Sequence, residues 1–229
     1  MNIKGLQKTT LLDFPGRVAC TVFTGGCNFR CPFCHNASLV LSPNNVDSIS
    51  EEEFFSFLSK RKGILDGVCI TGGEPLLQKD IVEFIRKIKN EGFDVKLDTN
   101  GSFPDRLKAI VSEDLLDYIA MDIKNSEEKY SLTAGIDGDC KQMFECIDFI
   151  MSSGVDYEFR TTVVKELHTI QDIENIAKRI KGAKRYFLQN FTDSGDLILP
   201  DLSAHSEETL SKMRDAAAPF VELCQLRGV

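Results

Sequence analysis

The segment VACTVFTGGCNFRCPFCHN, residues 18–36, decides how the rest of this 229-residue chain is interpreted. Its first part, VACTVF (18–23), is a short run of apolar and β-branched residues, which is typical of a buried β-strand. Directly after this run and the following TGG, cysteines stand at positions 27, 31 and 34. The order predicts a strand that delivers three thiols to the loop at its C-terminal end.

Further along the chain, the same kind of apolar run recurs. The runs are GVCIT (67–71), FDVKLDTN (93–100), LDYIAMDIK (116–124), VDYEFRTTVV (155–164) and RYFLQNF (185–191). Helical patterns lie between them, over 50–63, 79–92, 140–154 and 169–182, and a final helix is predicted over about 206–226. Ser50 and Glu53 form a capping-box pattern, and Ile81, Phe84, Ile85 and Ile88 form one apolar stripe.

Alternating strands and helices predict an α/β fold with a parallel sheet, right-handed crossovers and outer helices. A closed eight-stranded barrel takes about 250 residues, and this chain offers six strands. We therefore predict an incomplete (βα)6 TIM-like barrel that is open on one side, with a flat doubly wound sheet as the alternative. No linker, low-complexity tract or repeat marks a boundary, so one domain over 1–229 is expected.

Composition limits the partners. The formal charge is −8, and no cluster of Lys and Arg with aromatic residues is present, so nucleic acid is not expected. Neither a signal peptide nor about 18 consecutive apolar residues can be found, which predicts a cytoplasmic protein without membrane association. There, the eight cysteines are expected to be thiols, with Cys20 and Cys69 filling the core.

Three closely spaced cysteines predict a metal site. Thiolates bind zinc or iron–sulfur clusters, and structural zinc requires a fourth ligand. His35 is adjacent to Cys34 and is poorly placed to complete a tetrahedron, and no fourth cysteine is obvious. A four-iron cluster on three cysteines instead keeps one iron open to a ligand that is not protein.

The spacing C-x3-C-x2-C, with Phe33 before the last cysteine, resembles the radical S-adenosylmethionine (SAM) superfamily. The resemblance implies a 4Fe-4S cluster on Cys27, Cys31 and Cys34, with SAM chelating the open iron through its amine and carboxylate. One electron from the reduced cluster would cleave SAM into methionine and a 5′-deoxyadenosyl radical that abstracts hydrogen.

The strand after the cysteines ends in GGEP (72–75), which resembles the superfamily's motif for the methionyl amine. The resemblance implies that Gly72 and Gly73 let the backbone approach closely and that Glu74 accepts from an ammonium group. Alone, this tetrapeptide would be a plain turn. Its position at a strand end, about forty residues after the cysteines, favours the functional interpretation.

The next strand ends, DTNG (98–101), AMDIK (120–124) and FRTTVV (159–164), resemble those of the glycyl-radical-enzyme activases. The resemblance implies that Asp98, Thr99 and Asp122 surround a monovalent cation beside the SAM carboxylate, and that Lys124 and Arg160 contact SAM. The positively charged side chains of Lys124 and Arg160 are both suited to binding a carboxylate. The alternative for each residue is a solvated charge or a structural ion pair.

Several polar residues receive no defined role. Some activases place a histidine near the cation at the end of the last strand, where this chain has Gln189 and Asn190. The role of His35 stays open. His168 and His205 are expected on surface loops or helix starts.

The resemblance extends over nearly the whole chain, including the opening segment 5–36, and is greatest to the short activating proteins of anaerobic ribonucleoside-triphosphate reductase. It implies hydrogen abstraction from a glycine Cα in the large subunit of that reductase, with flavodoxin or ferredoxin as the electron donor. The alternatives are a pyruvate formate-lyase activating enzyme, a small-molecule radical SAM enzyme such as a deazapurine synthase, and a non-catalytic iron–sulfur or zinc protein.

Overall fold

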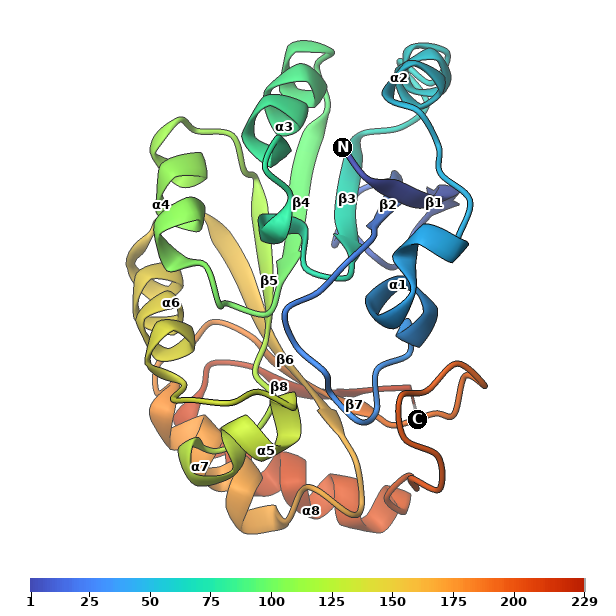
Figure 1. Ribbon diagram of the computed structural model, residues 1–229. Helices are drawn as coiled ribbons and strands as arrows, with labels where there is room; N and C mark the ends of the chain where they lie inside the picture. Colours follow the sequence, from blue (N-terminus) through green and yellow to red (C-terminus); the bar gives the residue numbers. More distant parts are fainter. Residues whose placement is uncertain (229) are drawn as a thin grey trace.

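A single curled sheet organises the computed structural model, which describes residues 1–228 (Figure 1). The eight strands are β1 (Ile3–Thr10), β2 (Ala19–Thr24), β3 (Gly67–Gly72), β4 (Asp94–Thr99), β5 (Tyr118–Asp122), β6 (Asp156–Val163), β7 (Tyr186–Asn190) and β8 (Cys224–Arg227). β1 runs antiparallel to β2, and every other neighbouring pair is parallel. The strands follow one another in chain order. This order excludes the doubly wound alternative, in which strand order reverses at a switch point.

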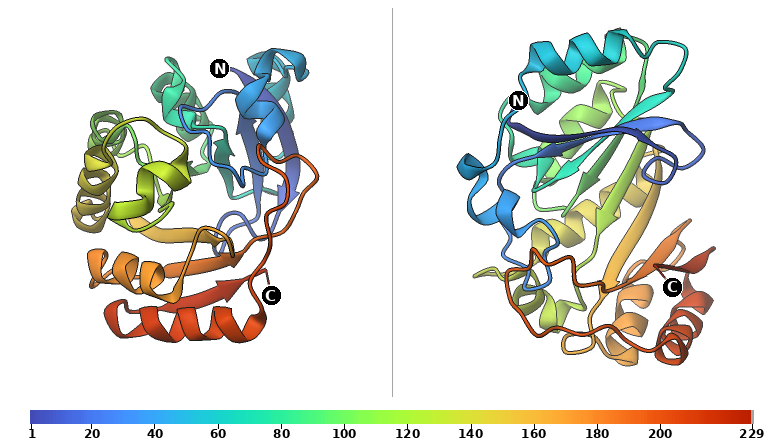
Figure 2. Two further views of the ribbon diagram at one scale, coloured as in Figure 1. Left: turned by 60° about the horizontal axis from the view of Figure 1, so that its bottom comes forward. Right: turned by 90° about the vertical axis from the view of Figure 1, so that its right-hand side faces the viewer.

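The longer helices cover the outer face of the curled sheet, as Figures 1 and 2 show. They are α2 (Glu51–Ser59), α3 (Ile81–Asn90), α4 (Pro104–Ser112), α6 (Lys141–Ser152), α7 (Ile170–Arg179) and α8 (Glu207–Ala217). The short helices α1 (Ala37–Leu41) and α5 (Tyr130–Ala134) lie at the end of the barrel where the cavity is. The predicted capping box is present at the start of α2, and the predicted apolar stripe of α3 is buried. None of the helices in the described part of the chain is long and apolar enough to cross a membrane.

The six predicted strands are β2 to β7, and each end lies within two residues of its predicted position. The two strands that were not predicted are β1 and β8. β1 is an edge strand whose outer part, Gln7 to Thr9, is exposed, so it lacks a clear apolar pattern. α4 was also missed, although Pro104 at its first turn is a typical helix start.

The predicted helix over 206–226 is wrong beyond Ala217. α8 ends there, and a short 3-10 turn containing Pro219 follows. Proline lacks a backbone N–H and cannot continue an α-helix. The chain then turns into β8, which pairs in parallel with β7.

The partial barrel is open at one side, as the sequence predicts. Within residues 1–228, β1 and β8 are the two edges of the sheet and do not pair with each other. Cys20 and Cys69 are fully buried in the strands, as expected for core residues. The C-terminal ends of the parallel strands gather at one end of the barrel, where polar side chains meet in a cavity.

Candidate active site

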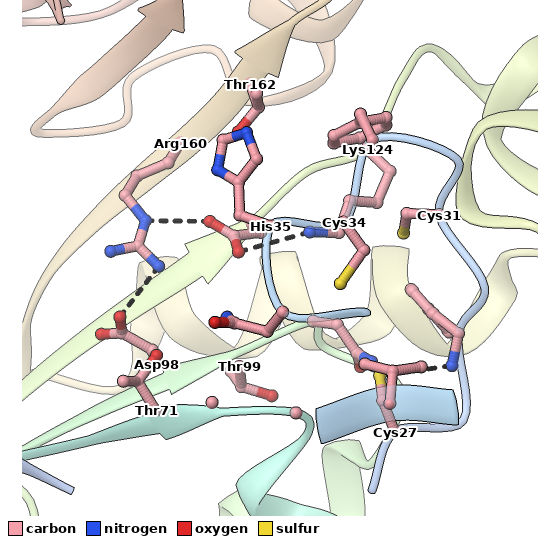
Figure 3. A pocket seen from close by; sticks show the side chains of 18 of the residues that line it. Cys27, Cys31, Cys34, His35, Thr71, Asp98, Thr99, Lys124, Arg160 and Thr162 are labelled. Atoms are coloured by element: carbon pink, nitrogen blue, oxygen red, sulfur yellow. Dashed lines mark hydrogen bonds and ion pairs between the residues drawn. The ribbon is translucent and has the colours of Figure 1, made fainter. Parts of the chain in front are cut away.

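Three thiols and four charged side chains face one another across a cavity of about 240 Å³ (Figure 3). The thiols of Cys27, Cys31 and Cys34 come from residues 25–34, which we call the thiol loop. The four charged residues are Asp98, Asp122, Lys124 and Arg160, which we call the charged wall. Phe33, Gly72, Gly73 and Thr99 also line the cavity, so the structure brings together every predicted site residue except Glu74.

The thiol loop is held by backbone contacts with distant segments. Glu74 N donates to Gly26 O (2.9 Å), and Arg30 N donates to Ala134 O at the end of α5 (2.9 Å). These bonds fix the start and the middle of the loop to other parts of the barrel. The thiol positions are therefore set by the fold as well as by the local sequence.

Two glycines make these contacts possible. A Cβ on Gly73 would lie 2.0 Å from Gly26 O, and a Cβ on Gly135 would lie 2.2 Å from Arg30 O. Gly135 also adopts φ +62°, in the left-handed region that favours glycine. The family resemblance explains the glycines of GGEP by a close approach of the cofactor to the backbone. The structure shows that Gly73 already closely approaches the thiol loop.

The three thiols have the chemistry of iron–sulfur ligands, and they line one cavity together. Burial raises the pKa of Cys27 to about 11 and that of Cys31 to about 12. Because thiolates are the ligands of iron–sulfur clusters, loading the site must release these protons.

Arg160 connects the two carboxylates of the charged wall. Its Nε donates to Asp122 Oδ1 (2.8 Å), and its Nη2 donates to Asp98 Oδ2 (3.0 Å). Lys124 Nζ donates to Asp122 Oδ2 (3.3 Å), and Lys96 pairs with Asp98 from the barrel interior. Asp122 and Arg160 are direct partners in the register of β5 and β6.

These contacts keep the charged wall ionised. Burial opposes ionisation, but Arg160 and Lys124 hold the pKa of Asp122 well below its ordinary value. Burial by itself would lower the pKa of Lys124, but the Asp122 carboxylate raises it. The Arg160 guanidinium lies between the carboxylates that the family resemblance assigns to a monovalent cation, so the cation stays a prediction.

Glu74 is fully buried and lies behind the wall of the cavity. Its Oε1 accepts from Leu76 N (3.0 Å) and from Thr99 Oγ1 (2.9 Å), and its Oε2 accepts from Asn100 N (2.7 Å). Burial raises the pKa of Glu74 to about 7 despite these donors. In this structure Glu74 joins the ends of β3 and β4, and its predicted contact with an ammonium group stays a prediction.

His168, which was expected on a surface loop or at a helix start, directly precedes the N-cap of α7 and is 1% exposed. Val164 N donates to its Nδ1 (3.1 Å), so the proton lies on Nε2, which donates to Lys124 O (2.8 Å). The imidazole also lies edge-on to the Phe33 ring at 6.3 Å. The expected place at a helix start is confirmed and the expected surface exposure is wrong, because the burial of an isolated histidine depends on tertiary packing.

The other polar residues without a predicted role separate into two groups. Gln189 and His35 line the cavity, and burial lowers the pKa of His35. Asn190 points elsewhere, and its Nδ2 donates to His205 O (3.4 Å). Thr162, at the end of β6, also lines the cavity and was not identified from the sequence.

The long segment after β7, residues 191–206, runs across to the thiol loop, and we call it the strap (Figure 2). Leu199 N donates to Pro32 O (2.9 Å). The Asp196 carboxylate accepts from Ser38 Oγ (2.8 Å) and from Ser38 N (3.1 Å). The strap therefore supports the thiol loop from outside the barrel.

Comparison with known proteins agrees with this geometry. The model of the radical SAM superfamily matches residues 21–180. The "Putative glycyl-radical enzyme activating enzyme" of Methanocaldococcus jannaschii is 31% identical over 99% of this chain and 96% of its own length. The pyruvate formate-lyase-activating enzyme of Clostridium pasteurianum is 27% identical over 96% of this chain and 98% of its own length.

Among solved structures, Streptococcus suis SuiB bound to SAM has a TM-score of 0.69 and 13% sequence identity, and it covers 89% of this chain and 48% of that chain. At this identity the likeness shows the fold alone. The match of the superfamily model spans the thiol loop and the ends of β2 to β6, which carry the cavity. This protein therefore belongs to the radical SAM superfamily, whose enzymes use a 4Fe-4S cluster together with SAM.

Proposed function

We propose that this protein activates a glycyl-radical enzyme and that its partner is the large subunit of anaerobic ribonucleoside-triphosphate reductase. The observation that carries the proposal is the end-to-end match to the relative named for glycyl-radical enzyme activation. The reaction would remove a hydrogen atom from a glycine Cα of the partner. We further propose that residues 1–229 act as one radical SAM domain.

In this proposal, Cys27, Cys31 and Cys34 hold a 4Fe-4S cluster, as the only thiols that line the cavity within residues 1–228. When bound, the cluster supplies the electron that cleaves SAM into methionine and a 5′-deoxyadenosyl radical. Lys124 and Arg160 bind the SAM carboxylate through charge-assisted hydrogen bonds. Asp98 and Asp122 hold the side chains of Lys124 and Arg160 in place. A monovalent metal cation beside the SAM carboxylate is also part of the proposal.

The open side of the barrel supports a protein substrate. We propose that a loop carrying the target glycine enters between β1 and β8, the two edge strands that do not pair with each other within residues 1–228. Because that loop must leave its own fold to enter, we expect a transient, conformationally gated complex. Flavodoxin or ferredoxin would supply electrons in the cytoplasm, and the eight free cysteines fit that reducing compartment.

The first test is anaerobic reconstitution with iron and sulfide, followed by reduction in the presence of SAM. We expect 5′-deoxyadenosine from the wild type and none from Cys31→Ala. A reduced, iron-loaded wild type that leaves SAM intact would contradict radical catalysis.

The second test identifies the partner. The protein is incubated with SAM, a reductant and either the reductase or pyruvate formate-lyase, and the electron paramagnetic resonance (EPR) doublet of a glycyl radical is measured. We expect the doublet with the reductase. A doublet with the formate-lyase alone would support the second candidate, which the similarity to the Clostridium pasteurianum enzyme favours.

A further inference from the structure

Asn100, at the end of β4, lies between the thiol loop and the charged wall. It is 6% exposed and lines the cavity. Its Nδ2 lies 3.8 Å from Cys27 Sγ, where an amide can donate to sulfur. The DTNG motif suggests roles for Asp98 and Thr99, but it assigns none to this side chain.

The surrounding contacts determine which way the amide points. Oδ1 accepts from Ser102 N (2.9 Å) and Ser102 Oγ (2.5 Å), and Nδ2 donates to Asn28 Oδ1 (3.0 Å). A flipped amide would place its NH2 group against the Ser102 N–H. The network therefore assigns the donor to the side of Cys27.

The backbone of Asn100 is fixed as well. Its N–H donates to Glu74 Oε2 (2.7 Å), and the same carboxylate accepts from Thr99 Oγ1 (2.9 Å). Because Glu74 N is bonded to Gly26 O, one buried residue connects the end of β4 to the start of the thiol loop. The distance between the Asn100 amide and the Cys27 sulfur is therefore set by the fold.

Cys27 differs from Cys31 in its surroundings. Phe29 N donates to Cys27 Sγ (3.3 Å), so this sulfur faces two N–H donors. Cys31 Sγ lies 3.6 Å from an acceptor, Ala134 O. Of the two donors at Cys27, only Asn100 uses a side chain, so only it can be removed by substitution.

We infer that Asn100 tunes the reduction potential of the cluster by donating a hydrogen bond to the Cys27 ligand sulfur. Hydrogen bonds to ligand sulfurs are among the factors that set iron–sulfur potentials. Donation withdraws electron density from the sulfur and stabilises the more negative, reduced cluster. Asn100 therefore raises the potential and makes the cluster easier to reduce. The inference rests on the superfamily's cluster and does not depend on the identity of the glycyl partner.

The test is an EPR-monitored redox titration of the reconstituted full-length protein without SAM, with iron and sulfide contents measured for each variant. Asn100→Ala should shift the midpoint potential to a more negative value. Asn100→Asp should shift it further, because a carboxylate cannot donate and adds negative charge. Asn100→Asp also keeps the acceptor for Ser102, so it decides the question if Asn100→Ala fails to fold.

Asn125→Ala is the matched control. This buried amide follows β5, and it donates to Thr133 Oγ1 (2.8 Å) and Leu167 O (3.1 Å), not to a sulfur. The midpoint potential of the Asn125→Ala variant should match that of the wild type even if the stability of the variant falls. The inference is overturned if an iron-loaded Asn100→Asp titrates like the wild type, or if Asn125→Ala shifts the potential equally. A wild type that assembles no cluster would instead contradict the superfamily's cofactor chemistry.

Discussion

The thiol loop and the charged wall face the same cavity but are built in different ways (Figure 3). All three thiols lie within residues 27–34 of one loop. The charged wall collects side chains from the ends of β4, β5 and β6, between Asp98 and Arg160, and depends on the register of three strands. In the proposed site, a cysteine substitution in the loop removes one of the three cluster ligands. A substitution in the wall weakens a network that keeps its other members.

The largest effect is expected from the thiol loop. Cys31→Ala removes a thiolate ligand, so the reconstituted protein should lose most of its cluster iron and all SAM cleavage. Iron content and 5′-deoxyadenosine formation measure this. Cys20→Ala is the control, because Cys20 is a fully buried thiol in β2 that does not line the cavity. Equal iron loss in both variants would show that general destabilisation, and not loss of a ligand, explains the result.

The charged wall should show the opposite behaviour. Lys124→Met keeps much of the side-chain volume but removes a charge-assisted hydrogen bond, which is worth about 1.5–3 kcal/mol. We expect about 10- to 100-fold weaker SAM binding with unchanged iron content. Isothermal titration of the reconstituted protein with SAM measures the affinity.

Lys129→Met is the control for the wall, because Lys129 pairs with Asp172 away from the cavity (2.7 Å). It should bind SAM like the wild type. Normal SAM affinity in Lys124→Met would show that the assignment of a SAM contact to this strand end is misplaced.

This contrast also explains what the sequence could predict. The thiol loop is a local pattern, and the strand ends that carry the wall follow apolar runs, so motif and position identify both. The ion pairs of Arg160 with Asp98 and Asp122 join residues 62 and 38 positions apart, and they depend on strand register. Sequence patterns do not specify register across three parallel strands.

The features that the sequence did not predict, which are a strand, a buried histidine and a contact of Asn100, all depend on tertiary structure. β8 is only four residues long and lies at the end of the stretch for which a helix was predicted. His168 is buried because Lys124 O and Val164 come together around it. The amide of Asn100 meets a sulfur 73 positions away. None of these contacts leaves a periodic or local signature.

A moderate effect is expected where the two halves of the site are joined. His168 donates to Lys124 O on the charged side, and its ring lies against Phe33 on the thiol side. His168→Leu should leave the Lys124 carbonyl unpaired, cost about 1–3 kcal/mol of unfolding free energy, and weaken SAM binding several-fold. His168→Gln can still donate from its amide, so it should recover most of the affinity. Thermal unfolding and SAM titration distinguish the two variants, and identical SAM affinities would contradict a positioning role.

The smallest effect is expected from the strap, which supports the thiol loop without lining the cavity. Asp196→Ala removes the acceptor for Ser38 N and Oγ, so residues 191–206 should open more often. Loss of about 1 kcal/mol from a local opening equilibrium corresponds to roughly fivefold faster amide exchange. Asp193→Ala is the matched control, because Asp193 accepts from Gly195 N within the same segment. If both variants accelerate exchange equally in residues 32–40 as well as in the strap, Asp196 does not transmit support to the thiol loop. If only Asp196→Ala accelerates exchange in residues 32–40, the thiol loop depends on a segment more than 150 positions away in the sequence. The thiol loop would then also rely on non-local contacts, and it would differ from the charged wall only in degree.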